Sequence, residues 1–182
     1  ASMVEELTAQ GLQVHLLSGD NLPAVSAIAQ HLAIHHVKAE ALPAEKADYV
    51  SHLQTSLHVG MVGDGINDAP ALAAAELGIA IGTGTDIAIE TAQVILMRGN
   101  LNSLIQARRL SSATLRIIYQ NLFWAFGYNV ALIPIAAGIL APFAFLPEPL
   151  RMLHPITAAF AMAASDLVIV YNSLRLRTIS LD

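Results

Sequence analysis

Two long apolar runs in the second half of the sequence limit what this chain can fold into. Residues 117–140 and 153–176 each hold 24 amino acids, which as helices would be about 36 Å long, against a bilayer core of about 30 Å. Both runs lie far from the amino end, and neither has the short apolar core and cleavage site of a signal peptide. We therefore expect two transmembrane helices; a helical hairpin buried in a large soluble protein is the alternative.

The arginines around these runs predict their orientation. Arg108, Arg109 and Arg116 precede the first run, and Arg175 and Arg177 follow the second. Because basic residues favour the cytoplasmic side of a membrane, both ends of the hairpin should be cytoplasmic, with residues 141–152 outside. The sequence thus predicts a multi-pass integral membrane protein whose soluble part and tail, residues 177–182, lie in the cytoplasm.

The first hundred residues have the composition of a soluble part, in contrast to the rest of the chain. The whole chain is 55% hydrophobic and only 13% charged, which is too apolar for an ordinary soluble domain. Residues 1–100 carry a net charge of −8 and residues 101–182 a net charge of +3, which together give the stated −5. An acidic soluble part without a basic stripe argues against nucleic-acid binding. With no cysteine, the chain has neither disulfides nor thiolate sites.

Alternating strand and helix patterns fill the acidic part. We expect strands near 13–17, 36–39, 58–63, 78–81 and 93–97, and helices near 3–10, 21–33, 43–54, 70–76 and 86–91. This order predicts an α/β fold with a parallel, Rossmann-like sheet. Apolar residues at helical spacing in 102–119 predict a further helix, whose residues 101–116 would form a stalk leading into the first membrane run.

One short segment has the residues of a magnesium and phosphoryl site. Residues 63–70 read Gly-Asp-Gly-Ile-Asn-Asp-Ala-Pro and follow an apolar run. Mg²⁺ prefers hard oxygen ligands and shares its shell with phosphate, so Asp64 and Asp68 are the candidate ligands. Glycines beside Asp64 allow a sharp turn at the carboxyl end of a strand, where open α/β sheets bind their ligands.

These residues resemble the GDGxNDxP signature of the P-type cation-transporting ATPases, which have a haloacid-dehalogenase-like phosphorylation domain. Ser18-Gly19-Asp20 is similar to the family's Thr-Gly-Asp, whose hydroxyl contacts the phosphoryl group, and residues 41–46 resemble the segment that presents the family lysine. The resemblance implies that Lys46 neutralises charge at the phosphoryl group. The candidate catalytic residues are Ser18, Gly19, Asp20, Lys46, Asp64, Asn67 and Asp68.

Polar residues inside the two apolar runs resemble the copper(I)-transporting subgroup. Tyr128-Asn129 and Met162-x-x-Ser165 are similar to the Tyr-Asn and Met-x-x-Ser-Ser motifs that help to form its intramembrane metal sites. Asp166 stands where the subgroup has its second serine, and a carboxylate favours a harder ion or a proton. The predicted cargo is copper(I), with zinc or another metal as the alternative, and a structural role for Asp166 also stays open.

Parts of such a pump have no counterpart in this sequence. The phosphorylated aspartate of the resembled family lies in Asp-Lys-Thr-Gly-Thr, which does not occur here, and no Cys-Pro-Cys type motif is present. We therefore expect residues 1–100 to be part of a phosphorylation domain in the carboxyl-terminal piece of a longer pump. The remaining domains would supply the nucleophile and bind most of the ATP, so this piece alone should be inactive. A membrane-anchored phosphatase and a non-catalytic fragment are the rival interpretations.

Seven histidines also raise the question of a metal site in the soluble part. His31 and His35 have the spacing of a helical ligand pair, but the helix near 21–33 should end before Ile34, so the two would not share a face. We expect no soluble-domain metal site at these histidines.

Overall fold

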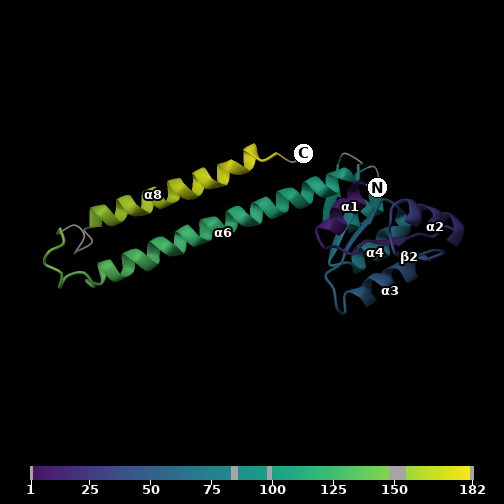
Figure 1. The fold of residues 1–182 in the computed structure, drawn as a ribbon, viewed down its shortest axis with the longest axis horizontal. Helices are drawn as coiled ribbons and strands as arrows, with labels where there is room; N and C mark the ends of the chain where they lie inside the picture. The colour runs from purple at the N-terminus through teal and green to yellow at the C-terminus, as the bar shows by residue number, and fades with distance from the viewer. Residues whose placement is uncertain (1, 83–85, 98–99, 148–154, 181–182) are drawn as a thin grey trace. The chain divides into compact units, whose positions relative to one another are not determined.

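The computed structural model of the chain describes residues 2–82, 86–97, 100–147 and 155–180. The chain divides into two compact units, residues 1–106 and residues 107–182. Each unit is described separately below (Figure 1).

The first unit alternates strands and helices as the sequence predicts. Its five strands are β1 (His15–Leu17), β2 (His36–Lys38), β3 (Gly60–Gly63), β4 (Leu77–Ile81) and β5 (Val94–Leu96). The helices are α1 (Ser2–Ala9), α2 (Leu22–His31), α3 (Pro43–Leu53), the 3₁₀ turn η1 (Ile66–Asp68), α4 (Ala69–Ala74) and α5 (Asp86–Thr91). Every strand and helix expected in this part is confirmed, with shifts of at most two residues at the ends.

All the strand pairings in the described residues are parallel, but they form two sheets. β1 pairs with β2, with Leu16 opposite Val37. β3 pairs with β4, and β4 with β5. Within the described part of the chain, β1 and β3 are therefore edge strands, each hydrogen-bonded to a neighbour on one side only.

Local sequence signals fix where the helices beside the site begin. The side chain of Asn21 accepts a hydrogen bond of 3.0 Å from the backbone nitrogen of Ala24, which caps α2. Pro43 opens α3, and Glu45 accepts a hydrogen bond of 2.9 Å from the backbone nitrogen of Leu42. Such contacts satisfy backbone groups that have no partner inside the helix. They set the start of α3 and therefore the direction of Lys46 in its first turns.

The core that supports the site lies between α3, α4 and the strands. Val50 of α3 and Ala71 of α4 are buried, and Leu17 of β1 and Met61 of β3 pack against the same cluster. Both edge strands thus contribute to one apolar core. A second cluster, centred on Val4, Ala29 and Ile34, joins α1 and α2 to β1 and β2.

The second unit consists of two long helices. α6 (Asn102–Ala136) starts in the first unit and continues through the second, and α8 (Pro155–Leu174) is followed by the 3₁₀ turn η2 (Arg175–Thr178). The expected helix at 102–119 does continue into the first apolar run. That helix ends at Ala136 rather than at the predicted Leu140, so the turn begins earlier than expected. Most of the second half of the predicted loop 141–152 lies outside the described residues.

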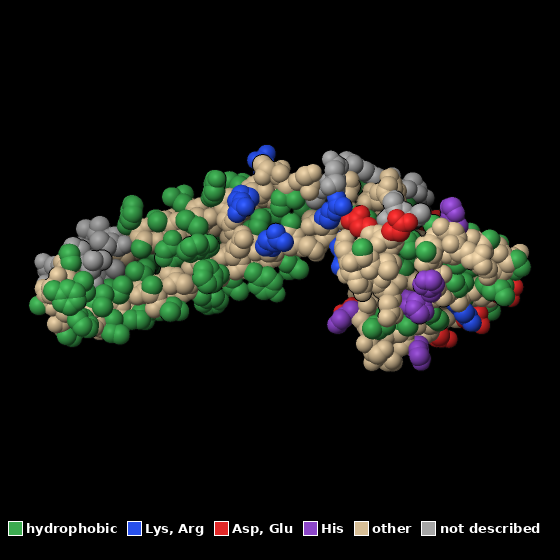
Figure 2. Space-filling view, in the orientation of Figure 1, with side chains coloured by type: hydrophobic (Ala, Val, Ile, Leu, Met, Phe, Trp, Pro, Cys, Tyr) green, Lys and Arg blue, Asp and Glu red, His purple; other side chains and the backbone are tan. Residues whose placement is uncertain are grey.

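Only one segment of the described chain, Ala158–Thr178, is long and apolar enough to cross a membrane by length and composition. This segment overlaps the second predicted run, and the presence of two transmembrane spans stays a prediction. Gln120, Asn121 and Asn129 lie within α6, and these amides, together with the earlier end of the helix, lower the apolar character of its second half. Hydrophobic side chains nevertheless cover much of the surface of both helices (Figure 2), including Phe123, Val130 and Phe160.

Candidate functional site

Ser18 lies in a tightly held turn directly after β1. Its backbone nitrogen donates to the carbonyl of Lys38 at 2.9 Å, and its carbonyl accepts from the backbone nitrogen of Ala41 at 2.9 Å. The Ser18 hydroxyl donates to Oδ2 of Asp20 at 3.0 Å and accepts from the Asp20 backbone nitrogen at 3.1 Å. The sequence-predicted Ser18-Gly19-Asp20 segment is thus tied to the 38–41 segment, and its hydroxyl has a defined direction.

Lys46 and Asp68 form an ion pair between α3 and η1. The distance from Nζ of Lys46 to Oδ1 of Asp68 is 2.7 Å, and the two side chains are 9% and 16% exposed. A lysine is rarely buried without a partner, because removing its charge from water is costly. The pair therefore holds together two predicted site residues that lie 22 positions apart in the sequence.

A close backbone approach explains one glycine of the signature. A Cβ atom at Gly63 would lie 2.7 Å from Cβ of Asp68 and 3.0 Å from its Oδ2. The turn continues through a hydrogen bond of 3.0 Å from the Asp68 nitrogen to the carbonyl of Gly65. Asp64, between the two glycines, is exposed. The sequence Gly-Asp-Gly thus folds so that Asp68 returns beside Gly63. Gly63 is the last residue of β3 and directly precedes Asp64 in the chain.

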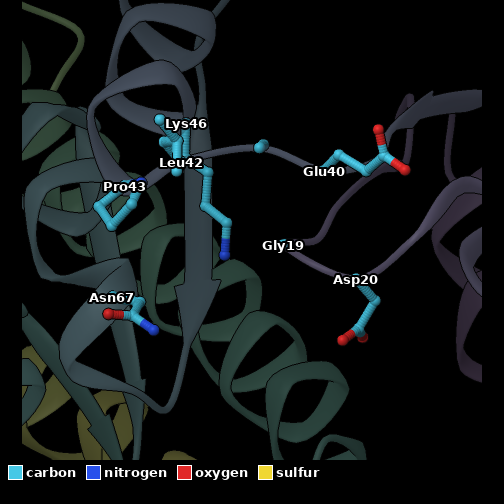
Figure 3. Close-up of a pocket in the computed structure, with 8 residues that line it drawn as sticks. Gly19, Asp20, Glu40, Leu42, Pro43, Lys46 and Asn67 are labelled. Carbon is cyan, nitrogen blue, oxygen red and sulfur yellow. The ribbon is translucent and has the colours of Figure 1, made fainter.

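A pocket of about 420 Å³ opens beside the ion pair. Its walls are Gly19, Asp20, Glu40, Ala41, Leu42, Pro43, Lys46 and Asn67. In Figure 3 the Lys46 amine points into the space between Asn67 and Asp20, which come from separate segments. A volume of this order is large enough for a phosphoryl group and its surroundings.

The structure brings most of the predicted catalytic residues together. Gly19, Asp20, Lys46 and Asn67 line the pocket, and Asp68 is joined to it through Lys46. Ser18 is hydrogen-bonded to Asp20, while Asp64 follows β3 and is not one of the pocket residues. Six of the seven candidates are therefore linked around the pocket, near the carboxyl ends of β1 and β3, where parallel sheets place ligands; Asp64 directly follows β3 outside the pocket.

The carboxylates present fit Mg²⁺. Asp68 uses Oδ1 for Lys46, so its Oδ2 is available as a hard oxygen donor, and Asp64 supplies two more oxygens. The described residues contain no group of three or more His, Cys, Asp or Glu side chains that could hold a metal. Two carboxylates are nevertheless a usual protein contribution for Mg²⁺, which completes its shell with phosphate and water.

Sequence reasoning missed Glu40, which lies in the pocket wall. Glu40 has a positive φ of 53°, which is uncommon for a residue other than glycine. Its nitrogen donates to the carbonyl of Asp20 at 2.9 Å. Glu40 directly precedes the segment 41–46 that resembles the family's lysine segment, and this position could have indicated it from the sequence.

The five candidates for the transported ion lie on α6 and α8 and differ in their exposure. Tyr128 and Ser165 are half-buried, whereas Asn129, Met162 and Asp166 are exposed. The Asn129 amide donates to the carbonyl of Ala125 within its own helix at 3.1 Å. The exposed three are therefore open to partners outside this pair of helices.

Two histidines of the first unit, His15 and His36, are in contact with each other. His15 stacks on His36 with ring centroids 4.4 Å apart, and its Nδ1 is 2.9 Å from the hydroxyl of Tyr49. Burial, and secondly the neighbouring His36, lower the pKa of His15 below its usual 6.5. α2 ends at His31, so His35 lies beyond the helix, as expected.

A family model and a search of known protein sequences both relate this chain to described proteins. Residues 1–76 match the model of the haloacid dehalogenase-like hydrolases. The chain is 50% identical to "Copper-transporting ATPase 2" of Rhizobium meliloti over 178 residues, 97% of this chain and 21% of that protein. It is also 50% identical to "Probable copper-exporting P-type ATPase V" of Mycobacterium tuberculosis over 183 residues, 100% of this chain and 22% of that protein.

A solved structure covers both units. A zinc-transporting PIB-type ATPase in the E2.Pi state matches 97% of this chain and 27% of its own, with a TM-score of 0.83 and 37% identity. The chain spans about a fifth of the length of the curated relatives it matches. The resemblance drawn from the motifs is therefore confirmed: residues 1–76 match the haloacid dehalogenase-like hydrolases, and the chain is homologous to part of the copper- and zinc-transporting P-type ATPases.

Proposed function

We propose that this chain is part of an ATP-driven transition-metal pump that exports copper(I) through an aspartyl-phosphate intermediate. The observation that carries the proposal is the buried pair of Lys46 and Asp68 beside the pocket, because it joins the two motifs that phosphoryl transfer requires. The copper-transporting relatives at about 50% identity support the same activity.

We infer a task for each residue at the phosphoryl site from its position. Lys46 stabilises the negative charge of the transferring group, and Asp68 holds the amine in position through its 2.7 Å contact. The Ser18 hydroxyl donates its hydrogen to Asp20 in this structure, and on binding it would turn from Asp20 to donate to a phosphoryl oxygen. Asp64 and Asp68 would hold Mg²⁺, which, when bound, neutralises charge on phosphoryl oxygens. Gly19 and Asn67 shape the pocket wall beside these groups.

The split between the two sheets supports a nucleophile from outside these residues. β1 and β3 each have one unpaired edge in the described chain, yet both pack on the core around Val50. A parallel strand placed between them would satisfy both edges. Its carboxyl end would then lie between Ser18 and Asp64, and we place the phosphorylated aspartate there.

The helices of the second unit supply the membrane part of the proposal. Ala158–Thr178 is the candidate span of the described chain, and α6 would accompany it with its amides turned toward α8 or other helices. Arg108, Arg109, Arg116, Arg175 and Arg177 lie toward one end of the pair, so this end would face the cytoplasm. The segment 101–116, which includes the first turns of α6, would act as the stalk between phosphorylation and transport.

The transported ion is the least constrained part of the proposal. Met162 is a soft thioether ligand that suits copper(I), and Tyr128, Asn129 and Ser165 would complete the path with remaining helices of the pump. Asp166, on the exposed face of α8, adds a carboxylate that favours a harder ion. Zinc is therefore the second candidate, and a solved zinc transporter at 37% identity supports keeping it.

Phosphoenzyme formation from labelled ATP tests the proposed activity. The complete protein should form a phosphoenzyme that requires Mg²⁺ and increases with copper(I). Hydroxylamine should release the label, because the intermediate is an acyl phosphate. The 182-residue chain alone should not be labelled. Labelling of this chain by itself would contradict the external nucleophile, and no labelling of the complete protein under any metal would contradict the pump.

A further inference from the structure

A small polar cluster joins α6 to α8 within the second unit. The Asn172 amide nitrogen donates to Oδ1 of Asn121 at 2.9 Å and to Oε1 of Gln120 at 3.2 Å. The Asn172 carbonyl oxygen accepts from Nη1 of Arg175 at 3.1 Å. Asn121 in turn donates to the hydroxyl of Ser173 at 2.9 Å. We call these five residues the Asn172 cluster.

The cluster is specific in its geometry. Asn172 is 8% exposed, and both hydrogens of its amide nitrogen are used by α6. A buried amide without partners is costly, most of all among apolar helices. Sliding α8 by one residue, or rotating it by one position, would leave the Asn172 and Asn121 amides unpaired. The cluster therefore favours one register between the two helices.

This register determines which residues face each other farther along the helices. α6 and α8 run antiparallel (Figure 1). Tyr128 comes seven residues after Asn121, and Ser165 comes seven residues before Asn172. Seven residues are about two helical turns, or about 10.5 Å, so each side chain returns to the face of its cluster residue at the same depth. Tyr128 and Ser165 are both half-buried, as this placement requires.

We propose that Asn172 is a positioning residue whose hydrogen bonds set the register of α8 against α6 and so hold Ser165 opposite Tyr128. The role of Tyr128 and Ser165 in the ion path rests on the proposed function. The register itself does not, because it follows from the contacts of the Asn172 cluster.

Cross-linking in the complete, membrane-inserted protein tests the register without ATP or metal. The pair Tyr128→Cys and Ser165→Cys should react with a short thiol cross-linker, and mass spectrometry of the linked peptides separates this product from other cysteines. The matched pair Tyr128→Cys and Leu167→Cys should react much less, since Leu167 lies on the opposite side of α8 and is 71% exposed. Equal reaction of both pairs would overturn the register.

Removing the Asn172 amide should loosen this arrangement. Interhelical hydrogen bonds in membranes shift equilibria by roughly three- to fifteenfold, so Asn172→Leu should lower the yield of the first pair by a factor in this range. Thr114→Val is the matched control, because it removes only a hydrogen bond within α6, from Oγ1 to the carbonyl of Leu110. If Asn172→Leu does not reach the membrane, Asn172→Asp keeps the acceptor for Arg175 and removes both donations to α6. Unchanged yields in the Asn172 variant that inserts would overturn the positioning role.

Metal-stimulated ATP hydrolysis distinguishes a positioning role of Asn172 from a merely structural one. In the Asn172 variant, the metal concentration for half-maximal stimulation should rise by the same roughly three- to fifteenfold, while kcat at saturating metal changes less. A loss of folded protein would instead lower kcat alone and contradict the proposal. If the parent protein showed no metal stimulation, the proposed function would fail, and the cross-linking result would still stand.

Discussion

The ion pair of Lys46 and Asp68 makes a quantitative prediction, because the same unit holds a far more exposed contact between a histidine, which is charged only when protonated, and a glutamate. The Lys46–Asp68 distance is 2.7 Å with side chains 9% and 16% exposed, and the His58–Glu76 distance is 2.8 Å with side chains 96% and 57% exposed. Breaking a buried pair by removing one partner costs about 3–5 kcal/mol, since the other charge is left without compensation. Because the Asp68 side chain is 16% exposed and so keeps some contact with solvent, we expect the lower value, about 3 kcal/mol, for Lys46→Met.

Hydrogen exchange of the complete protein measures this cost locally. Peptides from α3 and η1 should exchange roughly a hundredfold faster in Lys46→Met, which corresponds to about 3 kcal/mol of lost protection. His58→Gln should leave exchange in β3 and α4 unchanged, because exposed ion pairs contribute little. The double variant Lys46→Met with Asp68→Asn should recover part of the protection, since no unpaired charge remains.

The reasoning would be refuted if Lys46→Met and His58→Gln had equally small effects on exchange. It would also be refuted if the double variant lost the sum of the two single effects, because the two residues would then act independently. In either case Lys46 would be held by its helix rather than by Asp68, and the site would lack its proposed internal support.

Three further predictions concern other parts of the chain. Gly78→Ala should destabilise the first unit by about 2 kcal/mol in unfolding experiments, because the new Cβ would lie 2.6 Å from a carbonyl oxygen of α4, whereas Gly60→Ala, at 3.8 Å, should be tolerated. The lowered pKa of His15 means that the unfolded chain binds more protons below about pH 7, so the melting temperature should fall as the pH is lowered from 7 to 5; His15→Gln should weaken this dependence, and an unchanged slope would contradict it. Asp166→Ser in the complete pump should shift the metal dependence of ATP hydrolysis toward copper(I), and a profile equal to that of the parent would exclude a role in metal choice.

The sequence was sufficient for the local structure of the first unit because its signals are local. Strand runs such as 58–63, the proline that opens α3 and the glycine-rich turn at Asp64 act over a few residues. The motifs also predicted that Lys46 and Asp68 belong to one site, and the structure pairs their side chains. The end of α6 was misplaced by four residues, since an apolar run does not show where its helix stops.

Contacts between distant residues were decided by the tertiary structure. The place of Glu40 in the pocket depends on a backbone with positive φ beside Ser18-Gly19-Asp20, and composition does not encode this geometry. The Asn172 cluster joins residues 51 and 52 positions apart, so no periodic pattern in either helix could reveal it. Chemistry-bearing residues and element types follow from short stretches of sequence, whereas the pairing of Lys46 with Asp68 and of Asn172 with Asn121 follows from packing, which forces buried polar groups to find partners.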